Sequence, residues 1–175
     1  MRKISVTAST SGSGKTTVGR ELARRLDVPF VELDALVHGP NWVETPDDEL
    51  RALVEPIVAG DAWVIDGGYR GKIGNLVWDQ ADLIVWIDLP LRVWMPRLLR
   101  RTMRRLRGQE ELWNGNRETI RGAFIEWDGL FPYAVRMHFR RRREYPEELA
   151  GFPFVRLRSQ AEVDAFVAGA TDAAP

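Results

Sequence analysis

The sequence predicts a three-layer α/β/α fold in which a five-stranded, mostly parallel sheet is covered by helices on both faces. Short β-branched apolar runs alternate with segments of helical periodicity. A glycine-rich loop joins the first run to the first helical segment, and a polar residue follows each of the first four runs. Alternating strands and helices give parallel sheets that bind ligands beyond the carboxyl ends of their strands. We expect one domain over residues 1–175, long enough to bury a full core.

Short apolar runs, mostly rich in β-branched and aromatic residues, are the expected strands. They span 3–8, 29–34, 62–68, 82–90 and 152–159. The polar residues at the ends of the first four are Ser9, Asp34, Asp66 and Asp88. We expect these side chains to meet at one edge of the sheet.

Helical periodicity fills the intervals between these runs. The expected helices span 15–26, 45–60, 91–107, 117–143 and 161–170. The second carries a start signal, with Thr45 as N-cap, Pro46 at the first helical position and acids in the first turn. The residues of 171–175 are expected to fray.

Charge is distributed unevenly along a chain whose formal net charge is zero. Residues 92–143 hold fourteen arginines and five acidic residues, an excess of nine positive charges that predicts a segment built to meet anions. The absence of cysteine excludes disulfides and thiolate metal sites. No apolar run approaches the ~20 residues of a membrane span, and the N-terminus does not read as a signal peptide. We expect a cytoplasmic protein without a membrane partner.

The stretch "ASTSGSGKTT" (8–17) has the composition and context of a phosphate-binding loop, between a strand and a helix. Its backbone N–H groups and the helix N-terminus suit phosphate oxygens. The predicted ATP-binding residues are Ser11, Gly12, Ser13, Gly14, Lys15, Thr16 and Thr17. Lys15 is expected to reach the β- and γ-phosphates, and Thr16 to bind Mg²⁺. Ser9 stands where the pattern G-x-x-x-x-G-K-[ST] begins with glycine, and its consequence is open at this point.

The loop, with "VIDGGYR" (64–70) and "IDLPLRVWMPRLLRR" (87–101), resembles adenylate kinase and its relatives among the P-loop NTPases. Together with "LWNGNRE" (112–118), the pattern is most similar to bacterial proteins labelled topology modulation proteins. The resemblance implies an ATP-dependent phosphotransferase that moves the γ-phosphoryl group to a nucleotide, nucleoside or similar small acceptor. It also implies Mg²⁺ as cofactor and a helical, arginine-rich lid over about 98–125.

The resemblance assigns roles to four further residues. Asp66 matches the acid that holds Mg²⁺ through water, and Arg70 matches the arginine that grips an acceptor phosphate. Arg97 and Arg101 match lid-helix arginines that meet ATP and the transferring phosphoryl group, so Arg97 is also a predicted ATP-binding residue. Phosphoryl transfer needs such positive charge, and positions 97, 101 and 104 share one helix face. The arginines of 140–143 are expected only to favour the dipole at a helix end.

The match departs after the second strand, where nucleoside monophosphate kinases carry an arginine and this chain reads "ELDALVHGPNWVETP" (32–46). Asp34 at a strand end could hydrogen-bond to, or take a proton from, an acceptor hydroxyl, as acids do in kinases that resemble shikimate kinase. The other interpretation of Asp34 is a helix N-cap. The predicted acceptor residues are Asp34, His38, Trp42, Tyr69 and Arg70, and the predicted catalytic residues are Lys15, Asp34, Arg97 and Arg101.

Two alternatives stay open at the level of sequence. The basic segment also fits a nucleic-acid-associated or regulatory P-loop ATPase, although nucleic acid is disfavoured because the lid already employs these arginines. Arg70 favours a phosphate-bearing acceptor, whereas Asp34 favours a hydroxyl. Which of Asp34, Asp66 and Asp88 organises Mg²⁺ is also open.

Overall fold

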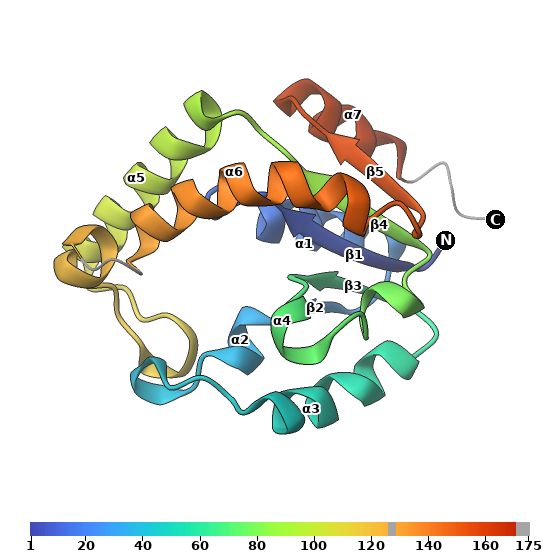
Figure 1. Ribbon diagram of the computed structural model, residues 1–175, viewed down its shortest axis with the longest axis horizontal. Coiled ribbons are helices and arrows are strands. Elements are labelled where there is room, and N and C mark those ends of the chain that lie inside the picture. The colour runs from blue at the N-terminus through green and yellow to red at the C-terminus, as the bar shows by residue number, and fades with distance from the viewer. Residues whose placement is uncertain (126–128, 171–175) are drawn as a thin grey trace.

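The computed structural model describes residues 1–125 and 129–170. Its centre is a single sheet whose strands run β2-β3-β1-β4-β5, and every pairing is parallel (Figure 1). The strands are β1 (Lys3–Ala8), β2 (Phe30–Glu32), β3 (Trp63–Asp66), β4 (Leu83–Ile87) and β5 (Phe154–Leu157). The predicted fold class is confirmed. The strand order puts β1, which leads into the glycine-rich loop, in the middle of the sheet.

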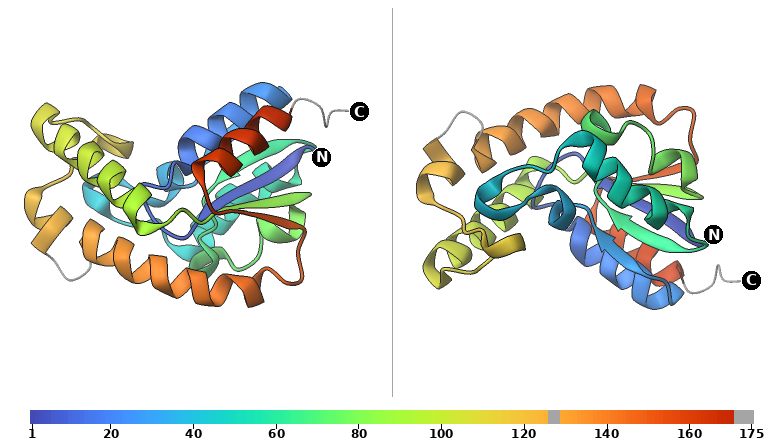
Figure 2. Two further views of the ribbon diagram at one scale, coloured as in Figure 1. Left: turned by 90° about the horizontal axis from the view of Figure 1, so that it is seen from above. Right: turned by 90° about the horizontal axis from the view of Figure 1, so that it is seen from below.

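Helices cover the sheet on both faces (Figure 2). Helices α1 (Lys15–Leu26) and α7 (Gln160–Gly169) lie on one face, and α3 (Asp47–Ala59) and the second half of α6 (Leu130–Glu148) lie on the other. The alternation of side chains along a strand explains both cores. In β4, Val85 and Ile87 pack towards α1, while Ile84 and Trp86 pack towards α3 and α6.

The remaining elements lie beyond the carboxyl edge of the sheet or connect it. They are α2 (Asp34–Val37), η1 (Pro40–Trp42), α4 (Arg70–Ile73), η2 (Trp78–Gln80), α5 (Leu91–Gly108), η3 (Trp113–Gly115) and the π-helical turn η4 (Arg121–Ile125). A small apolar cluster of Trp94, Leu98 and Ala134 joins α5 to α6. Residues 109–125 therefore extend from a helix pair that is anchored to the sheet (Figure 1).

Two sequence predictions about helices are wrong. The helix expected over 117–143 begins at Leu130 and continues to Glu148. Gly129 precedes it in an extended conformation, and Pro132 falls in the first turn, where a helix needs no N–H. The four arginines of 140–143 therefore lie inside α6, and the expected role at a helix end is wrong.

The predicted N-cap of α3 is also displaced by one residue. Pro46 occupies the cap position, and the Thr45 hydroxyl donates instead to the Leu36 carbonyl over 2.6 Å. The frayed tail expected at 171–175 lies outside the described residues. In the described part of the chain, no helix is both long and apolar enough to cross a membrane.

Candidate active site

The glycine-rich loop runs between β1 and α1, and helix α5 packs against it. Gly12 and Gly14 have φ of +79° and +88°, a region that suits glycine. A Cβ on Gly12 would lie 2.9 Å from the Leu98 Cβ and 3.0 Å from the Trp94 carbonyl oxygen. The loop is therefore in direct contact with the first half of α5, and only glycine fits at its apex.

Ser9, which replaces the first glycine of the pattern, is fully buried and has no positive φ. Its hydroxyl donates to Asp88 Oδ1 over 2.8 Å and accepts from Trp86 Nε1 over 2.9 Å. Asp88 is also held by Arg156, through two bonds of 2.6 and 3.0 Å, and by Arg142 at 3.2 Å. The serine is thus an anchor for the loop, and Asp88 is committed to neighbours other than a metal.

Lys15 and Thr16 both contact the buried carboxylate of Asp66. Lys15 Nζ lies 2.7 Å from Asp66 Oδ1, and the Thr16 hydroxyl donates to Asp66 Oδ2 over 2.6 Å. Burial lowers the pKa of Lys15, but the charges of Asp66 and Asp34 outweigh it and the net pKa is raised. Lys15 therefore keeps its positive charge, and it lies where the glycine-rich loop joins α1.

The oxygens near Thr16 fit Mg²⁺ bound to a nucleotide. Mg²⁺ in kinases takes one or two carboxylates and completes its shell with phosphate and water. Asp66 and Thr16 supply two such oxygens, and Glu32 Oε1 lies 3.4 Å from the Thr16 hydroxyl. Among residues 1–125 and 129–170, no group of three acids or histidines could hold a metal alone. Glu32 was not predicted, although its position at the end of the second apolar run was a usable signal.

Arg97 and Arg101 lie on α5 without an anionic partner. Within the described residues neither side chain makes a hydrogen bond or ion pair, and Arg101 Nε is buried without a partner. Burial lowers the pKa of Arg101, the charge of Arg105 adds to this effect, and Glu118 and Asp34 oppose it. A buried guanidinium in this state is prepared to receive an anion.

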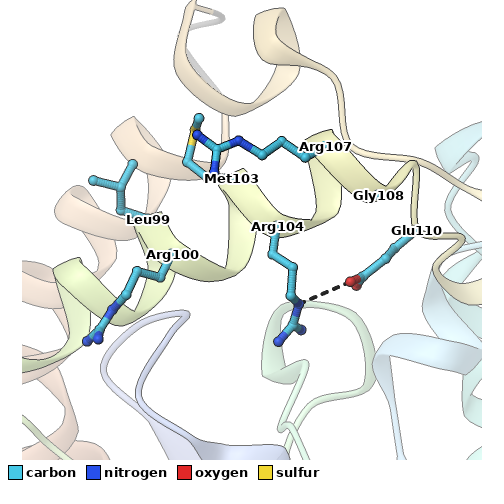
Figure 3. Close-up of a pocket in the computed structure, with 7 residues that line it drawn as sticks. All are labelled: Leu99, Arg100, Met103, Arg104, Arg107, Gly108 and Glu110. Atoms are coloured by element: carbon cyan, nitrogen blue, oxygen red, sulfur yellow. Dashed lines mark hydrogen bonds and ion pairs between the residues drawn. The ribbon is translucent and has the colours of Figure 1, made fainter.

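The outer face of α5 has a different character. A pocket of about 650 Å³ lies there, and in it Arg104 is paired with Glu110 at 3.0 Å. Figure 3 draws the residues that line this pocket. The residues lining it are Leu99, Arg100, Met103, Arg104, Arg107, Gly108 and Glu110. Because none of them belongs to the phosphate loop, this pocket is separate from the predicted nucleotide site.

A further cation comes from α6. Arg141 Nη1 donates to the Ala8 carbonyl at the end of β1 over 3.0 Å, and its charge acts to lower the pKa of Lys15. Arg141 therefore stands beside the phosphate loop. Sequence reasoning missed it, because a run of four arginines does not reveal which one a helix turns inward.

The predicted acceptor residues Asp34, His38, Trp42 and Tyr69 lie together. The Tyr69 hydroxyl donates to Asp34 Oδ1 over 2.5 Å and lies 3.4 Å from His38 Nε2. The His38 ring lies 5.5 Å from the Trp42 ring and 5.8 Å from the Trp113 ring, centroid to centroid. The cap position of α2 belongs to Leu33, and no side chain caps this helix, so the structure excludes Asp34 as an N-cap.

Two residues of this cluster have strained backbones. Trp42 and Tyr69 have φ of +60° and +41°, whereas Asn41 and Asn114, at +58° and +57°, occupy a region that asparagine tolerates. Bulky side chains rarely adopt this region, at a cost of about 1–3 kcal/mol each. Such strain gathers at functional sites, because the required direction of a side chain outweighs the preference of its backbone.

Residues 112–117 form a roof over α2 and η1 (Figure 1). The Asn114 amide donates to the His38 carbonyl over 2.6 Å. The buried Asn116 amide donates to the Gly39 carbonyl and accepts from the Trp42 N–H, both over 2.8 Å. The tip of the predicted lid is thus fixed to the segment that carries the acceptor residues.

Arg70 is separate from the other predicted acceptor residues. Its guanidinium pairs with Glu148, donates to Asn75 Oδ1 over 2.7 Å and lies 4.4 Å from the centre of the Trp78 ring. In the part of the chain that the structure describes, it forms no hydrogen bond or ion pair with the side chain of Asp34, His38, Trp42 or Tyr69. Arg70 could bind an acceptor phosphate only if its ion pair with Glu148 and its hydrogen bond to Asn75 were broken.

Comparison with known proteins points in one direction. The shikimate kinase family model matches residues 11–41. Shikimate kinase from Bacteroides thetaiotaomicron superposes with a TM-score of 0.58 at 18% identity, covering 97% of this chain and 95% of that one. A gluconokinase from Sinorhizobium meliloti 1021 gives 0.55 at 21% identity, covering 98% and 90%. Shikimate kinase from Acinetobacter baumannii in complex with shikimate gives 0.58 at 18%, covering 94% and 89%.

No curated protein matches the chain. The match of the family model covers the glycine-rich loop, α1, β2 and α2 and ends in η1, and the solved structures share the fold at low identity. The chain has the fold and the phosphate loop of ATP-dependent small-molecule phosphotransferases of the P-loop kind.

Proposed function

We propose that this protein transfers the γ-phosphoryl group of ATP to a hydroxyl group of a small molecule. One observation carries the proposal. Asp34, bonded to Tyr69, is close enough to Lys15 and Arg101 to act on the pKa of both. The charges of the proposed nucleotide side and of the proposed acceptor side therefore act on one another, as expected where phosphoryl transfer brings two substrates together.

The donor end of the reaction belongs to the phosphate loop. Residues 11–17 cradle the phosphates with their N–H groups, and Lys15 exchanges its contact with Asp66 for the β- and γ-phosphates. Thr16 and Asp66 would hold Mg²⁺, which when bound neutralises charge on the phosphate oxygens. The hydrogen bond of 2.6 Å from the Thr16 hydroxyl to Asp66 Oδ2 supports this assignment.

Three arginines are suited to the charge that develops during transfer. Arg97 and Arg101 lie on α5 and have no hydrogen-bond or ion-pair partner among the described residues, and Arg141 lies on α6 beside Lys15. Guanidinium groups bind phosphoryl oxygens in planar, bidentate fashion. Because these groups are held in place by helices, they need little rearrangement at the moment of transfer.

Asp34 is the proposed catalytic base. The acceptor oxygen forms a bond to the γ-phosphorus, the bond from that phosphorus to the bridging oxygen breaks, and ADP leaves with the electron pair. The hydroxyl proton passes to the Asp34 carboxylate. Burial raises the pKa of Tyr69 far above its usual range, and the charge of Asp34 adds to this effect. Tyr69 therefore keeps its proton and holds Asp34 in position throughout.

Acceptor-dependent release of ADP tests this function. Purified protein is incubated with Mg²⁺-ATP and a panel of hydroxyl compounds, and phosphorylated product is followed by ³¹P NMR. A P-loop ATPase with a regulatory or nucleic-acid-associated role would hydrolyse ATP at the same rate with and without acceptors, and this result would overturn the proposal. Addition of duplex DNA at low and high salt separates these two roles.

The resemblance of two sequence segments to a narrower group of bacterial proteins is also part of this proposal. The segments "IDLPLRVWMPRLLRR" and "LWNGNRE" resemble bacterial proteins labelled topology modulation proteins, and we propose that the chain belongs to this narrower group. ATP and Mg²⁺ are its proposed cofactors, a small molecule is its proposed second substrate, and the cytoplasmic location stays a prediction from sequence.

A further inference from the structure

The half of the molecule that carries the acceptor residues is strongly acidic. Residues 30–80 contain ten acidic side chains and only three cations, Arg51, Arg70 and Lys72. Residues 92–143 carry the opposite excess. A second substrate that enters between these halves meets negative charge on its own side, and the positive charge lies on the side of ATP.

None of the three cations is free to hold an acidic acceptor. Arg51 donates to the Ile73 carbonyl over 2.9 Å, and Lys72 lies 2.9 Å from Asp47 and 3.1 Å from Glu44. Arg70 is tied to Glu148, Asn75 and the Trp78 ring. An acceptor that carries a phosphate or carboxylate would have to displace one of these partners and leave a carboxylate or a carbonyl without its donor.

Around Asp34 and Tyr69, the groups that this acidic half offers for binding are aromatic rings and the Asp34 carboxylate. Trp42 is 41% exposed and Tyr133, on α6, is 40% exposed. Trp113 reaches the same cluster from the roof segment, through the His38 ring. Rings of this kind pack against the flat face of a sugar or base, while a carboxylate such as Asp34 accepts a hydrogen bond from a hydroxyl.

The strained backbones of Trp42 and Tyr69 are an independent observation. A turn alone would be served more cheaply by glycine or asparagine at these positions. The two large rings at positive φ are therefore required for what they contact. The bonds of Asn114 and Asn116 to the backbone of residues 38–42 fix the roof in register with them.

We infer that the acceptor is an uncharged, hydroxyl-bearing ring compound, either a nucleoside or a cyclic polyol. One hydroxyl binds Asp34, and the ring face packs on Trp42 and Trp113. This inference rests on the proposed function for the use of the site and narrows its substrate class. It sets the chain apart from kinases whose acceptors carry their own acid group.

Matched pairs of ligands test the inference by binding alone. Uridine is compared with uridine 5′-monophosphate, and D-glucose with D-glucuronate, by calorimetry in the presence of a non-hydrolysable ATP analogue and Mg²⁺. We expect at least one neutral compound to bind about tenfold or more tightly than its acidic partner. The two pairs also distinguish a nucleoside from a polyol. Tighter binding of both acidic members, or no binding of either neutral one, would overturn the inference, as would tighter binding of D-glucosamine than of glucose.

Variants then test the aromatic contacts. Trp42→Leu and Trp113→Leu should each weaken the neutral ligand about fivefold or more and leave the affinity for the ATP analogue unchanged. Phe139→Leu, an exposed aromatic on the outer face of α6, is the matched control and should change neither affinity. Unchanged ligand affinity in both tryptophan variants would exclude the ring contacts.

Failure of the inference and failure of the proposed function give different results. If neutral ligands bind but no phosphoryl group is transferred to them, the function fails and the ligand class stands. If transfer occurs only to acidic acceptors, the function stands and the ligand class fails.

Discussion

The hydroxyl of Ser9 donates to Asp88 over 2.8 Å, so two buried side chains join the first residue of the phosphate loop to the end of β4. The same carboxylate receives Arg156 from β5 and Arg142 from α6. Three elements that flank the nucleotide site are thus fixed to one another through Asp88. Ser9 is the only one of these partners that belongs to the loop.

Restoring glycine at position 9 should therefore harm the protein. Ser9→Gly removes a hydrogen bond to a charged group, a loss of about 2 kcal/mol or about 4–8 °C in Tm. The loop also loses its hydrogen bond to Asp88, so KM for ATP should rise. Thermal denaturation and ATP titration measure both effects. Ser5→Ala is the control, because Ser5 is a buried serine of β1 whose hydroxyl has no partner among the described residues. A Ser9→Gly protein as stable as the parent would contradict this account.

Lys15→Met should abolish phosphoryl transfer and also destabilise the fold. Asp66 is almost completely buried, and without Lys15 its charge lacks its principal partner. Breaking such a pair costs about 3 kcal/mol. The double variant with Asp66→Asn should recover most of the stability and none of the activity, as measured by denaturation and by product formation. Recovery of activity in the double variant would remove Lys15 from the mechanism.

Arg97→Ala and Arg101→Ala should reduce kcat by about 10²-fold, the usual effect of losing one donor to a developing charge. KM for the acceptor should change little. Arg100→Ala is the matched control, since among the described residues the Arg100 Nε–H donates to the Pro96 carbonyl of its own helix, and it should change kcat less than twofold. A rise confined to the acceptor KM would mean that α5 serves the acceptor instead of ATP.

Asp34→Asn should reduce kcat by about 10²-fold, the scale of general-base catalysis, with KM for ATP unchanged. Tyr69→Phe removes the proton that holds Asp34 and should give a smaller loss in kcat. Stability should change little in Asp34→Asn, because the amide oxygen still accepts from Tyr69. Near-normal turnover of Asp34→Asn with every acceptor would exclude it as the base.

His138 makes the stability of the fold depend on pH. Burial lowers its pKa, the charge of Arg142 lowers it further, and Asp88 opposes this effect. The fold therefore prefers neutral histidine, and stability present above the unfolded pKa of about 6.5 is lost as pH falls from there through the lower folded pKa. Tm should fall between pH 7 and pH 5. His138→Gln should flatten this slope, whereas an equal slope in both proteins would assign the effect to other groups.

The sequence was a good guide where local pattern and fold agree. Lys3–Ala8 and Lys15–Leu26 have the predicted bounds, because a buried strand, a glycine loop and an amphipathic helix each leave a clear signal. Both predicted ends of helix α6 were wrong. The start was placed too early because apolar residues continue across 117–129 without a strong break, and the end was placed too early because the helix continues through Pro146.

The candidate site was also predicted only in part: its residues could be named from the sequence, but their contacts could not. Asp34, His38, Trp42 and Tyr69 were predicted individually, but their contact depends on left-handed backbones at Trp42 and Tyr69 that no propensity favours. Arg70 is directed to Glu148 by the packing of α4 against the end of α6, a long-range contact that local pattern does not encode. For the same reason Arg141 and Arg142 could not be told apart from their neighbours.

The contact between Gly12 and Leu98 divides α5 into two parts with different freedom. From Trp94 to Thr102 one face of the helix is buried against the loop and α6, so these turns cannot tilt without disturbing the loop. Any hinge must lie beyond Thr102. The first half of α5 therefore belongs to the nucleotide frame, whereas residues 103–125, which include the roof over α2 and η1, could change in sequence without disturbing the phosphate loop.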